Sequence, residues 1–139
     1  MIPRSDTDTH LVGIFLIALA ATIVVHVVFV PRYFPGEFTR GLPYLVVGWG
    51  SYTLIFYTLG RLRPVDDRMP NMRAIDLGLG VFLSSIVLSG LLDAAGLTLA
   101  GTPLVHALPA AGVYIGLGLA GWGFGVRTRT VNRITAGDG

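Results

Sequence analysis

Four long apolar stretches dominate the chain, and short polar segments separate them. A helix rises about 1.5 Å per residue, so about 20 residues match the roughly 30 Å hydrocarbon core of a bilayer. The pattern predicts an all-α fold in a single membrane domain, 1–139, built as an antiparallel up-down-up-down bundle of four transmembrane helices. The expected helices cover about 11–30, 42–60, 75–93 and 103–126.

The segments between these helices set the expected boundaries. Pro31 and Pro35 oppose helix formation, which predicts an outer loop from Pro31 to Gly41. A polar inner loop, 61–73, is expected to join antiparallel neighbours. The third apolar stretch continues past Asp93, so the sequence leaves open whether residues 94–100 extend that helix. The tail from about 130 to 139 is polar and is predicted to be disordered.

Composition supports a membrane protein rather than a soluble domain. The chain has 139 residues, of which 53% are hydrophobic and 13% are charged. Soluble domains carry about 25% charged residues, so much of this surface is expected to face the lipid bilayer. Because there is no cysteine, disulfides and thiolate metal sites are excluded. The ten basic residues are all arginines at the ends of the apolar stretches, which indicates no nucleic-acid partner.

The distribution of arginine predicts the orientation in the membrane. Cytoplasmic loops are enriched in basic residues. Only Arg32 and Arg40 fall on one side of the predicted membrane. The other eight lie on the side that holds both termini: Arg4, Arg61, Arg63, Arg68, Arg73, Arg127, Arg129 and Arg133. The sequence therefore predicts a multi-pass protein of the cell membrane with its N- and C-termini in the cytoplasm.

The fourth apolar stretch contains two small-residue motifs. Gly112 with Gly116, and Gly121 with Gly125, each form a GxxxG pair. In lipid, such pairs let helices approach closely and gain dispersion contacts. We expect them to mediate helix packing inside the bundle. A seam between copies in a homo-oligomer, or a narrow lining for a cofactor, is the alternative interpretation.

Three ionisable residues, His26, Asp93 and His106, fall at one expected level near the outer ends of their helices. Ionisable residues are costly in lipid and are candidates for function. In the simplest interpretation, the histidines are neutral and hydrogen-bonded to Asp93, a backbone carbonyl or interfacial water. The sequence thus predicts a polar cluster near the outer surface, whose role is open.

Three functional hypotheses use this cluster. His26 and His106 could be the two axial ligands of a haem b, because bis-histidine ligation needs two neutral imidazoles on facing helices. The histidines with Asp93 could instead form a proton or cation site, since histidine changes charge near physiological pH. A metal site made of His26, His106 and Asp93, such as a zinc site, is a third possibility.

No enzyme signature is present in the sequence. Ser84, Ser85 and Ser89 share one predicted helix, with no histidine base near them in the sequence. The sequence favours a non-enzymatic accessory or scaffold subunit of a membrane complex, which associates with other membrane subunits or with copies of itself. A haem-b electron-transfer or membrane-anchor subunit, and a small proton or cation transporter or channel, are the alternatives.

Overall fold

The computed structural model describes residues 6–63 and 71–137, and within these ranges it contains helices and no strands. The predicted all-helical fold is therefore confirmed for the described part of the chain. The inner-loop residues 64–70, which include Arg68, and the N-terminal residue Arg4 lie outside it. The elements are α1 (Asp6–Val24), the π-helix η1 (Val25–Phe29), α2 (Val30–Tyr33), α3 (Phe38–Leu62), α4 (Arg73–Ala94), the 3-10 helix η2 (Pro103–His106) and α5 (Ala107–Gly137).

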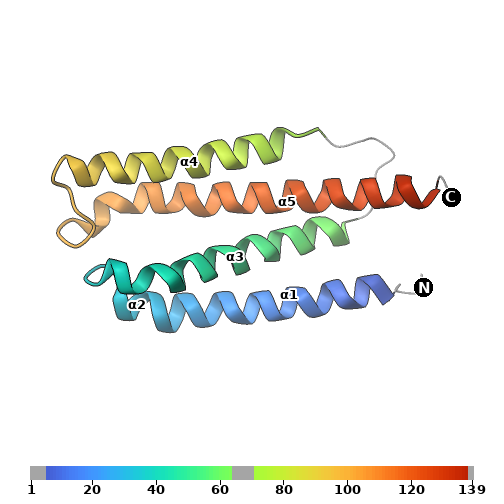
Figure 1. Ribbon diagram of the computed structural model, residues 1–139, viewed down its shortest axis with the longest axis horizontal. Coiled ribbons are helices and arrows are strands. Elements are labelled where there is room, and N and C mark those ends of the chain that lie inside the picture. Colours follow the sequence, from blue (N-terminus) through green and yellow to red (C-terminus); the bar gives the residue numbers. More distant parts are fainter. Residues whose placement is uncertain (1–5, 64–70, 138–139) are drawn as a thin grey trace.

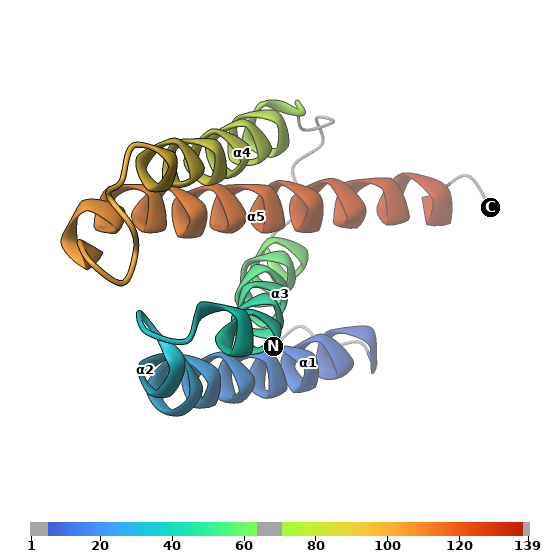
Figure 2. The ribbon, with the colours of Figure 1, turned by 60° about the vertical axis from the view of Figure 1, so that its left-hand side comes forward.

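The four long helices lie side by side in the order α1, α3, α5, α4, and the two ends of the chain lie at one end of the molecule (Figures 1 and 2). Helix α5 packs against both α3 and α4, and α3 also packs against α1. Helices α3 and α4, which loop 61–73 was expected to join as neighbours, each pack mainly on α5 rather than on each other. These two helices meet through the rings of Trp49 and Phe82, whose centroids are 5.7 Å apart.

Glycines on two faces of α5 explain its central position. A Cβ atom on Gly116 would lie 2.6 Å from the carbonyl oxygen of Gly78 on α4. Gly121 and Gly125 face the backbone of α3 instead, and Gly112 lies against Ser85 of α4. One GxxxG pair therefore lies in the α4 interface and the other in the α3 interface. The close approach adds dispersion contacts along both.

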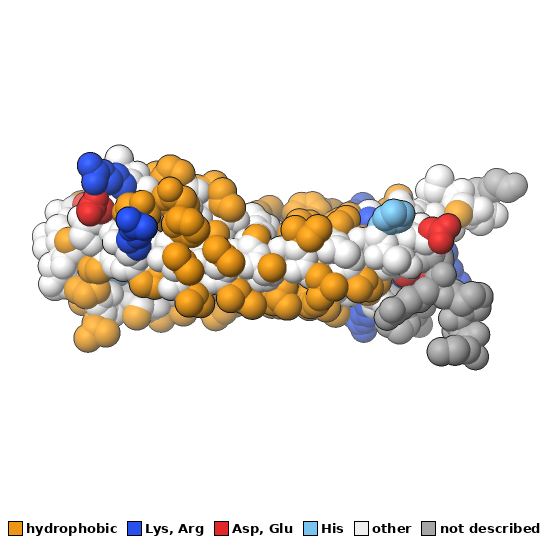
Figure 3. Space-filling view, turned by 90° about the horizontal axis from the view of Figure 1, so that it is seen from below, with side chains coloured by type: hydrophobic (Ala, Val, Ile, Leu, Met, Phe, Trp, Pro, Cys, Tyr) orange, Lys and Arg blue, Asp and Glu red, His pale blue; other side chains and the backbone are white. Residues whose placement is uncertain are grey.

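Three helical stretches are long and apolar enough to cross a membrane: Asp6–Tyr33, Arg73–Ala94 and Pro103–Gly137. Helix α3 is also long and has no charge from Gly41 to Gly60, but tyrosine, tryptophan, threonine and glycine dilute its apolar character. The visible surface has apolar side chains along its middle and charged side chains at both ends (Figure 3). Ile17 is 72% exposed and Leu91 is 63% exposed, so the surface is suited to lipid rather than water.

The first helical stretch continues beyond the expected end at Val30. The chain forms the π-helix η1 and then α2, which begins at Val30 and includes Pro31 in its first turn. The prediction that Pro31 begins the outer loop is wrong, because a proline in a first turn needs no N–H donor. The connection to α3 is correspondingly short, between Tyr33 and Phe38.

Helix α4 ends at Ala94, so of residues 94–100, whose place was left open, only Ala94 belongs to it. Gly96 has a φ of 89°, a left-handed conformation that glycine adopts without strain. Its N–H donates to the carbonyl of Asp93, and the N–H of Leu97 donates to the carbonyl of Leu92, each at 2.9 Å. This pair of hydrogen bonds is the Schellman arrangement that ends many helices.

The C-terminal tail is helical as far as Gly137. The prediction of disorder from about residue 130 is therefore wrong over 130–137, and residues 138–139 lie outside the described chain. No glycine or proline occurs between Val126 and Ala136 to end the helix. Polar side chains do not prevent this, since Thr128 and Thr135 each donate at 2.8 Å to a carbonyl one turn earlier.

Candidate functional site

His26 lies in the π-helical segment, and its ring is hydrogen-bonded at both nitrogens. Nδ1 is 2.8 Å from the carbonyl oxygen of Thr22. Because a carbonyl only accepts, Nδ1 carries a hydrogen, and in the neutral ring Nε2 is then an acceptor. The hydroxyl of Tyr114 donates to Nε2 at 2.5 Å. Short π-helical segments often occur at functional sites, which makes this pair a candidate centre.

Tyr114 and Gly48 position the imidazole between the helices. Tyr114 lies on α5, and its ring meets the His26 ring edge-on, with centroids 5.4 Å apart. On the opposite side, a Cβ atom on Gly48 would lie 2.9 Å from Cε1 of His26. The imidazole therefore fits because α3 has no side chain at this position.

Hydroxyl groups extend the polar contact between α1 and α3. The side-chain oxygens of Thr22 and Ser51 are 2.8 Å apart. Each also lies within bonding distance of a carbonyl of its own helix, Ala18 at 2.8 Å for Thr22 and Gly48 at 3.0 Å for Ser51. Because each hydroxyl has one hydrogen, the pair can reverse its direction of donation without moving heavy atoms.

Two aromatic residues of α3 complete the group. The ring of Tyr52 meets that of Tyr114 edge-on at 5.1 Å. The indole Nε1 of Trp49 is buried without a hydrogen-bond partner, near the Tyr114 hydroxyl but outside hydrogen-bonding geometry. We name this group the His26 cluster; it consists of Thr22, His26, Trp49, Ser51, Tyr52 and Tyr114.

His106 has a separate set of partners at the start of the last helix. Its side chain is buried, with 6% of the residue exposed. Nε2 donates to the carbonyl of Leu97 at 2.6 Å, and Nδ1 accepts from the hydroxyl of Ser89 at 2.8 Å. The sequence placed no histidine near the serines of this helix, but folding brings His106 to Ser89. The contact holds the α4–α5 connection against α4.

The structure does not assemble the predicted cluster of His26, Asp93 and His106. Asp93 is exposed, and no three His, Asp or Glu residues in the described ranges are grouped to hold a metal ion. His26 meets α5 at Tyr114, which is eight residues beyond His106 and therefore roughly 12 Å further along the helix. The expected single level is not found, because the first helical stretch continues past Val30 to Tyr33 and His26 therefore lies further from its outer end than the sequence indicated.

The same geometry bears on the haem hypothesis. Axial ligation requires one nitrogen from each of His26 and His106 to bind a single iron. Here Nε2 of His26 accepts from Tyr114, and Nε2 of His106 donates to Leu97. Both Nδ1 atoms are also hydrogen-bonded. The arrangement thus favours two separately hydrogen-bonded histidines over a shared haem.

A second polar group lies near the end of the molecule that holds the two termini. Nη1 of Arg129 donates to the carbonyl of Arg61 at 2.9 Å and lies 3.4 Å from a carboxylate oxygen of Asp8. Nη1 of Arg61 donates to the Tyr57 hydroxyl at 3.0 Å. Sequence reasoning missed this group and Tyr114. The sequence contains one indication of the role of Arg129. It follows Gly125 by one helical turn, so it lies on the same face of α5, which packs against α3.

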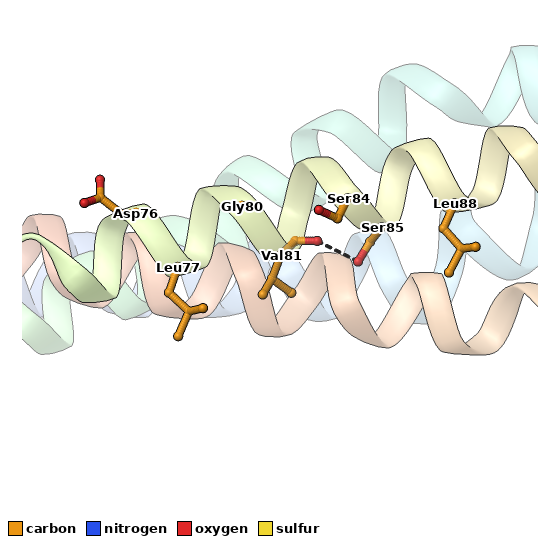
Figure 4. A pocket seen from close by; sticks show the side chains of 7 residues that line it. All are labelled: Asp76, Leu77, Gly80, Val81, Ser84, Ser85 and Leu88. Carbon is orange, nitrogen blue, oxygen red and sulfur yellow. Dashed lines mark hydrogen bonds between the residues drawn. The ribbon is translucent and has the colours of Figure 1, made fainter.

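Helix α4 has a surface groove of about 400 Å³ along its outward side (Figure 4). Small residues at Gly80 and Ser84 form its floor, with Asp76 near the start of the helix. A Cβ atom on Gly80 would meet nothing within 4 Å. The lining residues are Asp76, Leu77, Gly80, Val81, Ser84, Ser85 and Leu88.

Comparison with known proteins does not add to this description: no protein-family model, curated protein or solved structure matches the chain.

Proposed function

We propose that the protein crosses the cell membrane four times, with both termini in the cytoplasm, and that it is a small proton or cation transporter. The single observation that carries the proposal is the hydrogen bond between His26, in the first helical stretch, and Tyr114 of α5. The apolar middle of the surface and its charged ends support the membrane location (Figure 3). The concentration of arginines beside the two termini supports the orientation.

The position of the pair suits a transport site. Tyr114 lies near the middle of the last apolar stretch, and Trp49 and Tyr52 lie near the middle of α3. Transporter sites are usually near the bilayer midplane, and buried ionisable residues there are candidates for proton relay. Because His26 reaches Tyr114, its imidazole would lie towards this level, although His26 itself is closer to the outer end of its helix.

The geometry couples protonation of His26 to a change in the hydrogen bonds around it. In the neutral ring, Tyr114 donates to Nε2. When Nε2 takes up a proton, it becomes a donor, so the Tyr114 oxygen must accept and its own hydrogen must turn away from His26. The nearby unpaired N–H of Trp49 is a second donor for that oxygen. The cluster therefore has two hydrogen-bond arrangements that differ by one proton.

The seam between α1, α3 and α5 contains a second, separate set of polar groups. Towards the termini the seam contains Asp8, Tyr57, Arg61 and Arg129. Between this group and Tyr114 lies the interface of α3 and α5, where Gly121 packs against the backbone of α3. Close packing of the two helices therefore separates this second group from the His26 cluster.

Proton flux into liposomes tests the proposal. Purified protein is reconstituted with an enclosed pH-sensitive dye, and a potassium gradient with valinomycin drives proton entry. We expect flux with the wild-type chain and a loss of about tenfold or more in His26→Gln and in Tyr114→Phe. Tyr44→Phe is the matched control, because it removes a hydroxyl from a tyrosine of α3 that stacks on Phe29. Absence of wild-type flux, or equal flux in all variants, would refute the proposal.

An accessory or scaffold subunit is the second candidate, and the groove on α4 is the observation that favours it. Small residues on an outward face allow a transmembrane helix of another subunit to approach closely. In this case, Gly80→Leu should release a subunit that copurifies in mild detergent. Gly13→Leu, at an equally open glycine on α1, should retain it.

A further inference from the structure

The arrangement of Arg61 and Arg129 points to a binding site for a phosphate group at the cytoplasmic end of the helices, and we propose that an anionic lipid headgroup or a free phosphate occupies it. This inference is independent of proton transport. It uses a different part of the molecule, near the two termini (Figure 1).

Close packing of α3 and α5 brings the two arginines together. A Cβ atom on Gly125 would lie 3.0 Å from the backbone nitrogen of Arg61. Arg129 is one turn beyond Gly125, so its side chain lies over the end of α3, where Nη1 donates to the carbonyl of Arg61 at 2.9 Å. Carbonyls in the last turn of a helix lack partners within that helix. Arg129 thus caps α3 and is held beside the Arg61 side chain.

The two guanidinium groups keep donors that the protein does not satisfy. Nε of Arg61 and Nε of Arg129 are both buried without a hydrogen-bond partner. The Arg129 side chain as a whole is 32% exposed, so part of its planar group can be reached from outside. Unpaired donors on a charged group cost free energy, and an anion that contacts the exposed part of the group would stabilise its positive charge.

The charge at this end is also incompletely balanced. Asp8 is 3.4 Å from Nη1 of Arg129, which is longer than the 2.7–2.9 Å or so of a strong charge-assisted bond. A third cation lies on the same pair of helices, where the Arg63 guanidinium is 5.7 Å from the centroid of the Trp122 ring. Among the described residues, these two guanidinium groups beside one carboxylate leave a net positive charge, and Arg63 adds to it.

Phosphate is the ligand that this chemistry fits. The guanidinium fork matches the oxygens of a phosphate group, and basic pockets between helices at the cytoplasmic surface bind anionic lipid headgroups. The shared chemistry is a phosphate oxyanion, which a phospholipid such as phosphatidylglycerol or free inorganic phosphate would supply.

Native mass spectrometry of the full chain, with phosphatidylglycerol as the probe, tests the site. Phosphatidylcholine with the same acyl chains is the control lipid. We expect a retained phosphatidylglycerol adduct on the wild-type chain and a loss of about tenfold in affinity for Arg61→Gln, because a hydrogen bond to a charged group is removed. This substitution keeps the backbone carbonyl that Arg129 caps. Arg129→Gln should have a similar effect, and circular dichroism confirms that each variant is helical.

Arg40→Gln is the matched control, because Arg40 is an exposed arginine in a surface pair with Glu37 at the other end of the molecule. It should bind as the wild type does. Titration with inorganic phosphate then separates the two sources. A lipid adduct that persists at millimolar phosphate identifies the headgroup, whereas displacement by phosphate, with phosphate alone raising the melting temperature, identifies the free anion. Equal retention of both lipids, or unchanged binding by Arg61→Gln, would overturn the inference.

Discussion

The carbonyl of Leu97, in the connection between α4 and α5, accepts a hydrogen bond of 2.6 Å from Nε2 of His106. The other ring nitrogen accepts from Ser89 at 2.8 Å. One buried side chain therefore joins the end of α4, the connection and the start of the last helix. Since a carbonyl in this connection has no helical partner, His106 satisfies a backbone group that would otherwise need water.

Replacement of His106 by alanine should destabilise the protein. The change removes two hydrogen bonds and leaves the Leu97 carbonyl without its partner, which should cost about 1–3 kcal/mol. The free energy of unfolding can be measured by titration with sodium dodecyl sulfate in mixed micelles. His10→Ala is the control, because His10 is exposed near the start of α1. Equal stability of His106→Ala and wild type would show that the contact contributes little.

Two glycines on α4 should respond differently to alanine. A Cβ atom on Gly78 would lie 2.5 Å from the backbone nitrogen of Ala120, so Gly78→Ala must separate α4 from α5. We expect a loss of about 1–3 kcal/mol, as for other overpacked sites. Gly80 has open space at the same position, and Gly80→Ala should change stability by no more than about 0.5 kcal/mol. Unfolding midpoints of the two variants in parallel give the comparison, and similar midpoints would contradict this packing.

The apolar pattern was sufficient to predict the helices but not their order. Each stretch is long and nearly free of charge, so its identity as a helix follows from local composition. The neighbours of α5 depend on which of its faces carry glycine, and both faces do. Gly116 packs on α4 and Gly121 packs on α3. A pattern with small residues on two faces does not indicate which helix each face meets.

The candidate site was harder to predict for a similar reason. His26 and His106 could be recognised as ionisable residues within the apolar stretches, and each ring is within hydrogen-bonding distance of a backbone carbonyl. Their partners could not be predicted, because Tyr114 is 88 residues from His26 and the π-helical turn changes the direction of the ring. Helix rise gives depth in the membrane but no rotation about the helix axis.

The hydrogen bond between His26 and Tyr114 should contribute measurably to stability. Interhelical hydrogen bonds in membrane proteins have a mean coupling energy of about 0.6 kcal/mol and reach about 1.7 kcal/mol. A short bond to a part-buried imidazole between helices should lie in the upper part of this range. A double-mutant cycle with Tyr114→Phe and His26→Leu measures the coupling energy in the same detergent titration. A value near zero would mean that the two residues do not interact in the folded protein.

The absence of cysteine makes the proposed orientation directly testable. A single cysteine can be introduced as Gly36→Cys, in the exposed turn between α2 and α3, or as Thr135→Cys, on the exposed last turns of α5. In intact cells, a membrane-impermeant maleimide should label Gly36→Cys at once and Thr135→Cys only after the membrane is permeabilised. A cysteine fits at both positions. A Cβ on Gly36 meets nothing within 4 Å, and Thr135 is exposed. Labelling in the reverse order would place the termini outside and transfer the Arg61–Arg129 site to the outer surface. Labelling of both positions in intact cells would instead rule out the three crossings proposed between the Gly36 turn and the C-terminal end, because two positions on the same side of the membrane are separated by an even number of crossings.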